Sequence, residues 1–101
     1  MILASLDAAK RHLAITDPAR DAEVQYTLEH ASAIIFEYIG AQADASWDET
    51  SAPATAQRAT LEMLAHLWEH RGDDVAPDQH DQKLWEGISL LCMRLRDPAV
   101  A

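Results

Sequence analysis

The chain has 101 residues and carries 8 Lys plus Arg against 17 Asp plus Glu, which gives a formal net charge of -9. This length fits one domain, and 49% hydrophobic with 25% charged residues is the balance of a soluble globular protein. An acidic surface repels phosphate, so the charge argues against a dedicated nucleic-acid-binding site. An acidic wall would, however, let a DNA duplex slide past without holding it.

Composition also bears on secondary structure and compartment. Only three Gly and four Pro occur, and abundant Ala and Leu favour helices over strands. The single cysteine, Cys92, lies in an apolar run, so we expect a core residue in a reducing compartment. No apolar run approaches the roughly 20 residues needed to span a membrane. Residues 1–4 are too short an apolar stretch for a signal peptide.

The first two predicted elements are helices with recognisable start signals. Ser5 is an N-cap candidate for a short helix over residues 6–14. Asp17 followed by Pro18 predicts the start of a second helix, which runs to about residue 39 and ends at Gly40. Apolar residues recur along one face of this second helix: Val24, Leu28, Ala31, Ile35 and Tyr38.

A polar loop over residues 41–52, built around Trp47, precedes the third predicted helix. Loops this long in small domains are usually functional or mobile. The third helix covers residues 53–71, with Pro53 at its start and Gly72 as its stop. Its expected apolar side consists of Ala56, Met63, Leu64, Leu67 and Trp68.

Residues 72–80 form a second, acidic loop, and a fourth helix is predicted over residues 81–95. Its expected buried face consists of Leu84, Ile88, Leu91 and Leu95, with Trp85 and Cys92 alongside. No segment shows the period-two alternation of a strand. We therefore predict an all-α fold: a small four-helix domain spanning residues 1–101, with two long antiparallel helices.

This order of elements resembles the phage head–tail connector (head-completion adaptor) family. Its members have a short helix, a long helix, a variable loop, a third helix and a C-terminal helix. SLDAAKRHLAI is similar to the opening helix, and DPARDAEVQYTLEHASAIIFEYIG is similar to the long helix with its Tyr-x-Gly ending. PATAQRATLEMLAHLWEHRGD is similar to the third helix, and LLCMRLRDPAV to the closing segment. The resemblance covers nearly the whole chain, although the acidic second loop is longer than expected for the family.

The resemblance implies a structural virion protein and not an enzyme, with no cofactor. Such proteins form a ring, typically a dodecamer, between the portal and the tail. The ring extends the DNA channel and serves as a tail attachment platform. The implied partners are further copies of the chain, the portal protein, and the tail or next neck protein. DNA would pass through without specific binding, and no membrane is involved. The implied location is the head–tail neck of the virion, after synthesis in the cytoplasm of the bacterial host.

The closing segment is the first candidate contact surface. By resemblance it fastens the adaptor to the portal, which makes the candidate docking residues Arg94, Arg96, Asp97, Pro98 and Val100. The two arginines are conspicuous among only 8 Lys plus Arg, and arginine suits bidentate contacts with carboxylates. The alternative is that they compensate the helix dipole at a C-terminus.

The loop around Trp47 is the second candidate surface. Aromatic side chains are enriched at the centres of interfaces, so Trp47, Asp48 and Glu49 are candidates for a subunit or tail interface. The alternative is that Trp47 packs beneath its own loop.

Two sequence patterns resemble those of catalytic sites. His66, Glu69 and His70 satisfy the H-x-x-E-H pattern of inverted zinc proteases. A catalytic zinc site needs a third protein ligand and a cleft, so we expect two structural histidines, with an adventitious metal site as the alternative. Cys92 has no partner assigned by sequence, and an apolar setting raises a thiol pKa. The acidic second loop lacks EF-hand spacing, so we expect it to be solvated.

A second function class stays open on the sequence. A small acidic helical module could bind a basic partner in a bacterial cell, as an antitoxin or regulator does. Portal and capsid genes beside this one would favour the connector, and a lone toxin-like neighbour would favour the interaction module.

Overall fold

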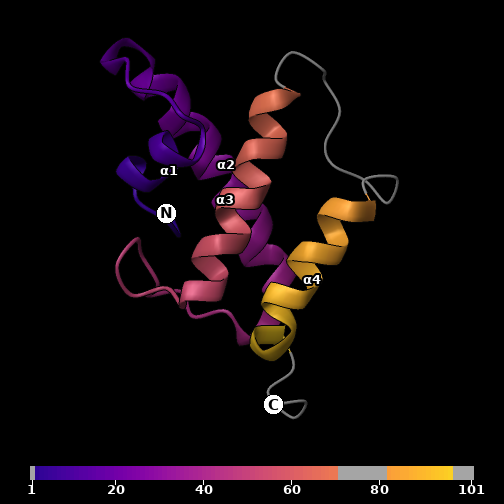
Figure 1. Ribbon diagram of the computed structural model, residues 1–101. Helices are drawn as coiled ribbons and strands as arrows, with labels where there is room; N and C mark the ends of the chain where they lie inside the picture. The colour runs from indigo at the N-terminus through magenta and orange to yellow at the C-terminus, as the bar shows by residue number, and fades with distance from the viewer. Residues whose placement is uncertain (1, 71–81, 97–101) are drawn as a thin grey trace.

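The computed structural model describes residues 2–70 and 82–96, and within these ranges the chain forms helices and no strand. The elements are α1 (Leu6–His12), α2 (Asp21–Ile39), α3 (Ala54–Glu69) and α4 (Gln82–Arg96), with 3₁₀ turns at Pro18–Arg20 and Gly40–Gln42. Helices α2 and α3 form the long antiparallel pair, and α4 runs back along α3 (Figure 1). The predicted all-α, four-helix architecture is confirmed.

The first helix begins where the sequence predicts and ends earlier than residue 14. The Ser5 hydroxyl accepts a hydrogen bond from the Ala8 N–H at 3.0 Å, as an N-cap does. At the other end, the Ala14 N–H donates to the Arg11 carbonyl at 3.2 Å, and the Ile15 N–H donates to the Lys10 carbonyl at 2.9 Å. This pair of bonds is a Schellman ending, and Ala14 occupies its left-handed position with φ 58°.

The predicted second helix is two segments in series. The Asp17 carboxylate accepts a hydrogen bond from the Ala19 N–H at 2.9 Å, and Pro18 opens a 3₁₀ turn that continues directly into α2. At the far end, Gly40 has φ 77°. A Cβ there would meet no atom within 4 Å, so the backbone angle, and not crowding, requires the glycine.

The third and fourth helices lie close to their predicted spans, but α3 ends at Glu69, with His70 as its C-cap, and α4 runs to Arg96, one residue past the predicted end. Helix α3 begins directly after Pro53, and the Gln57 side-chain amide donates to the Ala52 carbonyl at 2.9 Å, which anchors the preceding loop. Residue 71, the predicted Gly72 stop and the 72–80 loop lie outside the described residues.

The core lies mainly between α2 and α3. The stripe predicted in α2 is buried from Val24 to Ile35, while Tyr38 is half-buried. On α3 the buried side chains are Ala56, Ala59, Thr60, Met63 and Leu64. Small residues on both helices allow close backbone approach, and each buried Leu or Ile contributes about 1.5–3 kcal/mol of transfer free energy. Leu67 and Trp68 lie at the edge of this core and are half-buried.

A buried serine ties the N-terminal segment to α2. The Ser32 hydroxyl accepts a hydrogen bond from the Leu3 N–H at 3.0 Å and donates to the Leu28 carbonyl at 2.8 Å. Both Leu3 and Ser32 are fully buried. Sequence periodicity did not indicate this contact, because Ser32 lies next to the apolar stripe and reads as a polar surface residue.

Charged contacts fasten α1 and the 3₁₀ turn to the long helices. The Lys10 ammonium lies 2.6 Å from the Asp21 carboxylate, whose Oδ1 atom is buried. The Arg20 guanidinium lies 5.1 Å from the centre of the Trp68 ring at the end of α3. A cation over an aromatic face is attractive even at the surface, so the start of α2 is fixed to the end of α3.

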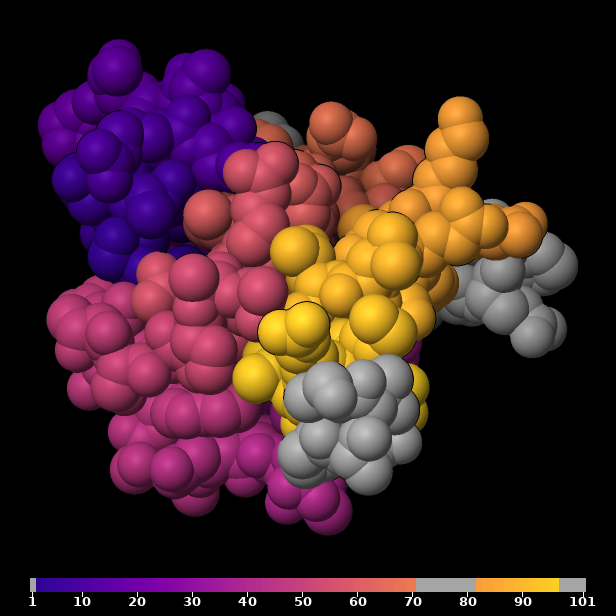
Figure 2. Space-filling model, turned by 60° about the horizontal axis from the view of Figure 1, so that its bottom comes forward, coloured from indigo at the N-terminus to yellow at the C-terminus, as the bar shows by residue number. Residues whose placement is uncertain are grey.

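Helix α4 packs more lightly than its sequence stripe predicts. Ile88 and Cys92 are fully buried, whereas Leu84, Leu91 and Leu95 are half-buried. Figure 2 shows the surface of α4 beside that of α3 along one side of the molecule. Within the described ranges, no helix is long and apolar enough to cross a membrane.

Candidate functional site

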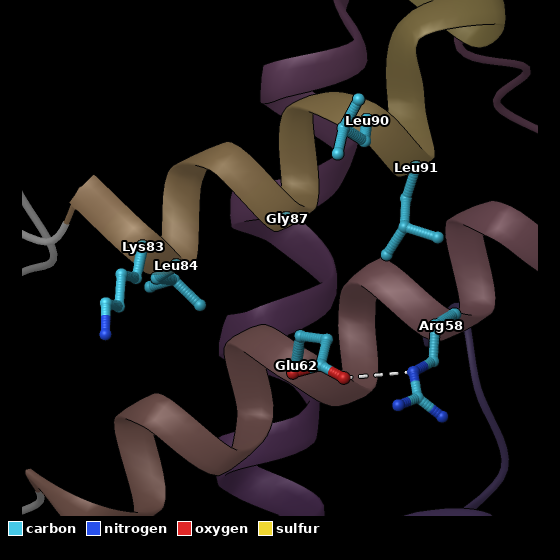
Figure 3. A pocket seen from close by; sticks show the side chains of 7 residues that line it. All are labelled: Arg58, Glu62, Lys83, Leu84, Gly87, Leu90 and Leu91. Carbon is cyan, nitrogen blue, oxygen red and sulfur yellow. Dashed lines mark hydrogen bonds and ion pairs between the residues drawn. The ribbon is translucent and has the colours of Figure 1, made fainter.

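A groove lies between α3 and α4 on the described surface. It has a volume of about 420 Å³, and its lining residues are Arg58, Glu62, Lys83, Leu84, Gly87, Leu90 and Leu91 (Figure 3). Gly87 contributes no side chain, and a Cβ there would meet nothing within 4 Å. The groove therefore exists partly because α4 has a glycine facing α3's outer edge.

The groove has an apolar wall and a charged rim. Leucine side chains from α4 make up the wall, and Leu90 is 72% exposed. On the rim, the Arg58 Nε donates to the Glu62 carboxylate at 2.9 Å, one turn away on α3 (Figure 3). Lys83 lies on the α4 side. The arrangement suits an apolar side chain flanked by a carboxylate that can approach Lys83.

The two predicted docking arginines have different surroundings. The Arg96 guanidinium carbon lies 4.4 Å from the centre of the Tyr38 ring, and its Nη1 lies 3.5 Å from the Tyr38 hydroxyl. Tyr38 also contacts Trp85, with ring centres 5.3 Å apart. Arg96 thus holds α4 on the end of α2. Arg94 is exposed on the outer side of α4.

Three further predicted docking residues, Asp97, Pro98 and Val100, lie outside the described part of the chain. Both docking arginines in the described part of the chain are exposed, and the Arg96 guanidinium also lies over the Tyr38 ring. The C-terminal turn of α4 also gains from both arginines, because cations there complement the helix dipole.

The Trp47 loop has an ordered internal structure. The Asp48 carboxylate accepts hydrogen bonds from the N–H groups of Thr50 and Ser51, each at 2.9 Å. These bonds lower the Asp48 pKa to about 2. The Asp44 carboxylate accepts hydrogen bonds from the Ser46 hydroxyl at 2.7 Å and from the Ser46 N–H at 2.8 Å, and these bonds lower the Asp44 pKa.

Within this loop, Trp47 is half-buried and packs against the core, and Glu49 is exposed. Trp47 therefore packs against the core and keeps part of its surface accessible. The loop contains two successive aspartate turns, at Asp44 and Asp48.

The two patterns that resemble catalytic sites lie at the end of α3, at His66, Glu69 and His70, and on α4, at Cys92. The rings of His66 and His70 lie 4.5 Å apart on one face of α3, and Glu69 is exposed. Among the described residues, no group of three or more side chains is arranged to hold a metal ion. Cys92 is buried, and this burial raises the pKa of its thiol to about 11.

Sequence reasoning missed the exposed apolar residues Tyr26, Leu90 and Met93. All three lie off the predicted stripes, so a helical projection of the outward faces would have indicated them.

Comparison with protein-family models, with curated proteins and with solved structures found no match.

Proposed function

We propose that this chain is a head–tail connector subunit, a structural virion protein that forms an adaptor ring between portal and tail. The observation that supports the proposal is the order and extent of its helices. A short α1, a long α2 ending at Gly40, an ordered loop, an antiparallel α3 and a closing α4 follow the order that the sequence resemblance implies. The proposal assigns the chain no reaction and no cofactor.

The charge of the chain suits a conduit. With a net charge of -9, the wall of such a ring repels the phosphates of the duplex, so DNA passes through without being held. The ring extends the channel, and its outer end is the platform for the tail or the next neck protein. A dodecamer is the ring size that the resemblance implies.

The docking residues have separate roles under this proposal. Arg94, exposed on α4, meets carboxylates on the portal, and Asp97, Pro98 and Val100 extend that contact. Arg96 sets the position of α4 through Tyr38. The loop with Trp47, Asp48 and Glu49 presents a surface of fixed shape to the tail or to a neighbouring subunit.

The test is to inactivate the gene in a strain that produces particles and to image the lysate. We expect DNA-filled heads without tails, and we expect the purified chain to restore tail attachment when it is added back. Tailed, infectious particles from the inactivated strain would contradict the proposal. Recovery of the chain with one small basic protein and no portal would support the antitoxin or regulator alternative instead.

A further inference from the structure

Three large apolar side chains are strongly exposed in the described part of the chain. They are Tyr26 at 74%, Leu90 at 72% and Met93 at 46%. Tyr26 lies on α2, and the other two lie on α4. Single exposed apolar residues are ordinary, so the decisive observation is the charge that surrounds each of them.

The outward face of α2 is acidic. Along α2 the chain has no Lys or Arg, and its acids are Asp21, Glu23, Glu29 and Glu37. Helical spacing places exposed residues on one side, here called the acidic α2 face: Ala22, Glu23, Tyr26, Glu29, His30, Ala33 and Glu37. Tyr26 is 74% exposed, with Glu23 toward the N-terminal end of this face and Glu29 and Glu37 toward its C-terminal end.

The outward face of α4 has the opposite charge. Arg96 lies against Tyr38, so the cations on this face are Lys83 and Arg94, and Glu86 is its acid. Exposed residues at helical spacing form what we call the basic α4 face: Lys83, Glu86, Leu90, Met93 and Arg94. The groove at Gly87 opens beside Leu90 (Figure 3). An apolar centre with cationic ends therefore lies on a chain that is otherwise strongly acidic.

We infer that the acidic α2 face of one copy docks on the basic α4 face of the next copy, with Tyr26 entering the groove beside Leu90. The inference rests on the proposed ring-forming function, whose subunit contact it names. Helix α3 packs against both α2 and α4, so their outward faces point in different directions (Figure 1). Two different faces that meet give a head-to-tail contact, which is the kind that closes into a ring.

This contact also explains how copies with a net charge of -9 can associate. Charges farther apart than about 8–10 Å are largely screened at physiological ionic strength. Opposite charges that the contact brings within that distance, Lys83 or Arg94 against Glu29 or Glu37, attract, whereas the repulsion between acids farther from the contact is screened.

Cross-linking of the full-length chain tests the contact even if association is weak. We would mix a Tyr26→Cys variant with a Leu90→Cys variant of different mass and add a short bismaleimide. Cys92 is fully buried, so its background reaction is low. We expect the mixed dimer to exceed either self-dimer by about tenfold, since only unlike faces meet. Self-dimers alone, or no cross-link, would overturn the inference.

Charge reversal separates this contact from a general effect of net charge. The double variant Lys83→Glu/Arg94→Glu should weaken association, and so should Glu29→Lys/Glu37→Lys, although the latter reduces the net negative charge. Combining all four changes should restore association toward the parent. All four side chains are exposed, so melting temperatures should stay close to that of the parent. Stronger association of Glu29→Lys/Glu37→Lys would overturn the inference, because only general repulsion predicts it.

A matched control uses two exposed acids elsewhere. The variant Asp7→Lys/Glu69→Lys makes the same change in net charge away from both faces. We expect it to associate at least as well as the parent. Binding to the portal, measured on the Tyr26→Cys and Leu90→Cys variants, keeps the two ideas distinct, because both variants retain the proposed portal-docking residue Arg94. Portal binding without mixed cross-links would contradict the proposed subunit contact and support the connector function. Mixed cross-links without portal binding would support the contact and contradict the connector function.

Discussion

The Arg96 guanidinium lies 4.4 Å above the centre of the Tyr38 ring, which joins the last turn of α4 to the last turn of α2. We therefore expect Arg96→Ala to lower the free energy of unfolding by about 0.5–1 kcal/mol, the value of an exposed cation–π contact. Urea denaturation measures this loss. Tyr38→Phe keeps the ring and should cost less than Arg96→Ala.

Arg94 provides the contrast to Arg96. Because its side chain is exposed on the outer side of α4, Arg94→Ala should change stability by less than about 0.5 kcal/mol. It should instead weaken binding to the portal, most of all at low salt, because surface charges act mainly through association rate. Equal losses of stability in the two variants would show that the arginines share one structural role.

Ser32 is the polar group on which the N-terminal segment depends. Replacing it with Ala leaves the buried Leu3 N–H without its acceptor, so we expect a loss of about 1–3 kcal/mol in unfolding free energy. Thr60 is the control, since its hydroxyl donates to the Ala56 carbonyl of its own helix at 2.8 Å. Thr60→Val should cost less. A Ser32→Ala variant as stable as the parent would mean that the 3.0 Å bond contributes little.

Ala14 offers a stabilising change. Its φ of 58° lies in the left-handed region, which a residue with a Cβ adopts at a cost and glycine adopts freely. We expect Ala14→Gly to raise the unfolding free energy by about 0.5–1 kcal/mol, after allowance for the larger entropy of glycine in the unfolded chain. Thermal melting measures it. Ala9→Gly, inside α1, should destabilise the protein and serves as the control.

The two kinds of apolar position on α4 should respond differently to truncation. Ile88 is fully buried, so Ile88→Ala should cost about 2–5 kcal/mol. Leu91 is half-buried at the groove, so Leu91→Ala should cost clearly less. If Leu91→Ala proves as costly as Ile88→Ala, then α4 sits deeper against α3 than the structure places it.

The buried thiol of Cys92 gives a pH dependence with a definite sign. Burial raises its pKa to about 11 from an ordinary value of 9.0, so between these values the unfolded chain releases the proton and the folded chain keeps it. Stability from this group is present below pH 9.0 and is lost as the pH rises toward about 11. Cys92→Val lacks the thiol and should show a shallower decline in urea midpoint. Identical slopes would contradict the prediction.

The helices could be predicted from sequence because their signals are local. Caps at Ser5 and Asp17, the proline at Pro53 and the ending at Gly40 act within one or two turns, and the α2 stripe follows from periodicity. The Schellman ending at Ala14 was missed because alanine is not the residue that usually marks it.

The surface features could be predicted less well, since they depend on which helix covers which face. Leu90 and Leu91 are neighbours in sequence, yet one is 72% exposed and the other is half-buried. The contact of Arg96 with Tyr38 joins residues 58 positions apart, and no local pattern encodes that separation. The groove likewise depends on where Gly87 falls relative to α3.

The three tryptophans of the chain occupy three different junctions: Trp47 in the loop before α3, Trp68 beneath Arg20, and Trp85 against Tyr38. Their indole emission therefore provides intrinsic optical reporters, one for each joint of the fold. Variants that retain a single tryptophan would let fluorescence follow the loop, the α2–α3 corner or the seating of α4 separately, without any attached dye. Emission from Trp85 would then show whether α4 keeps its position against Tyr38 when a partner binds.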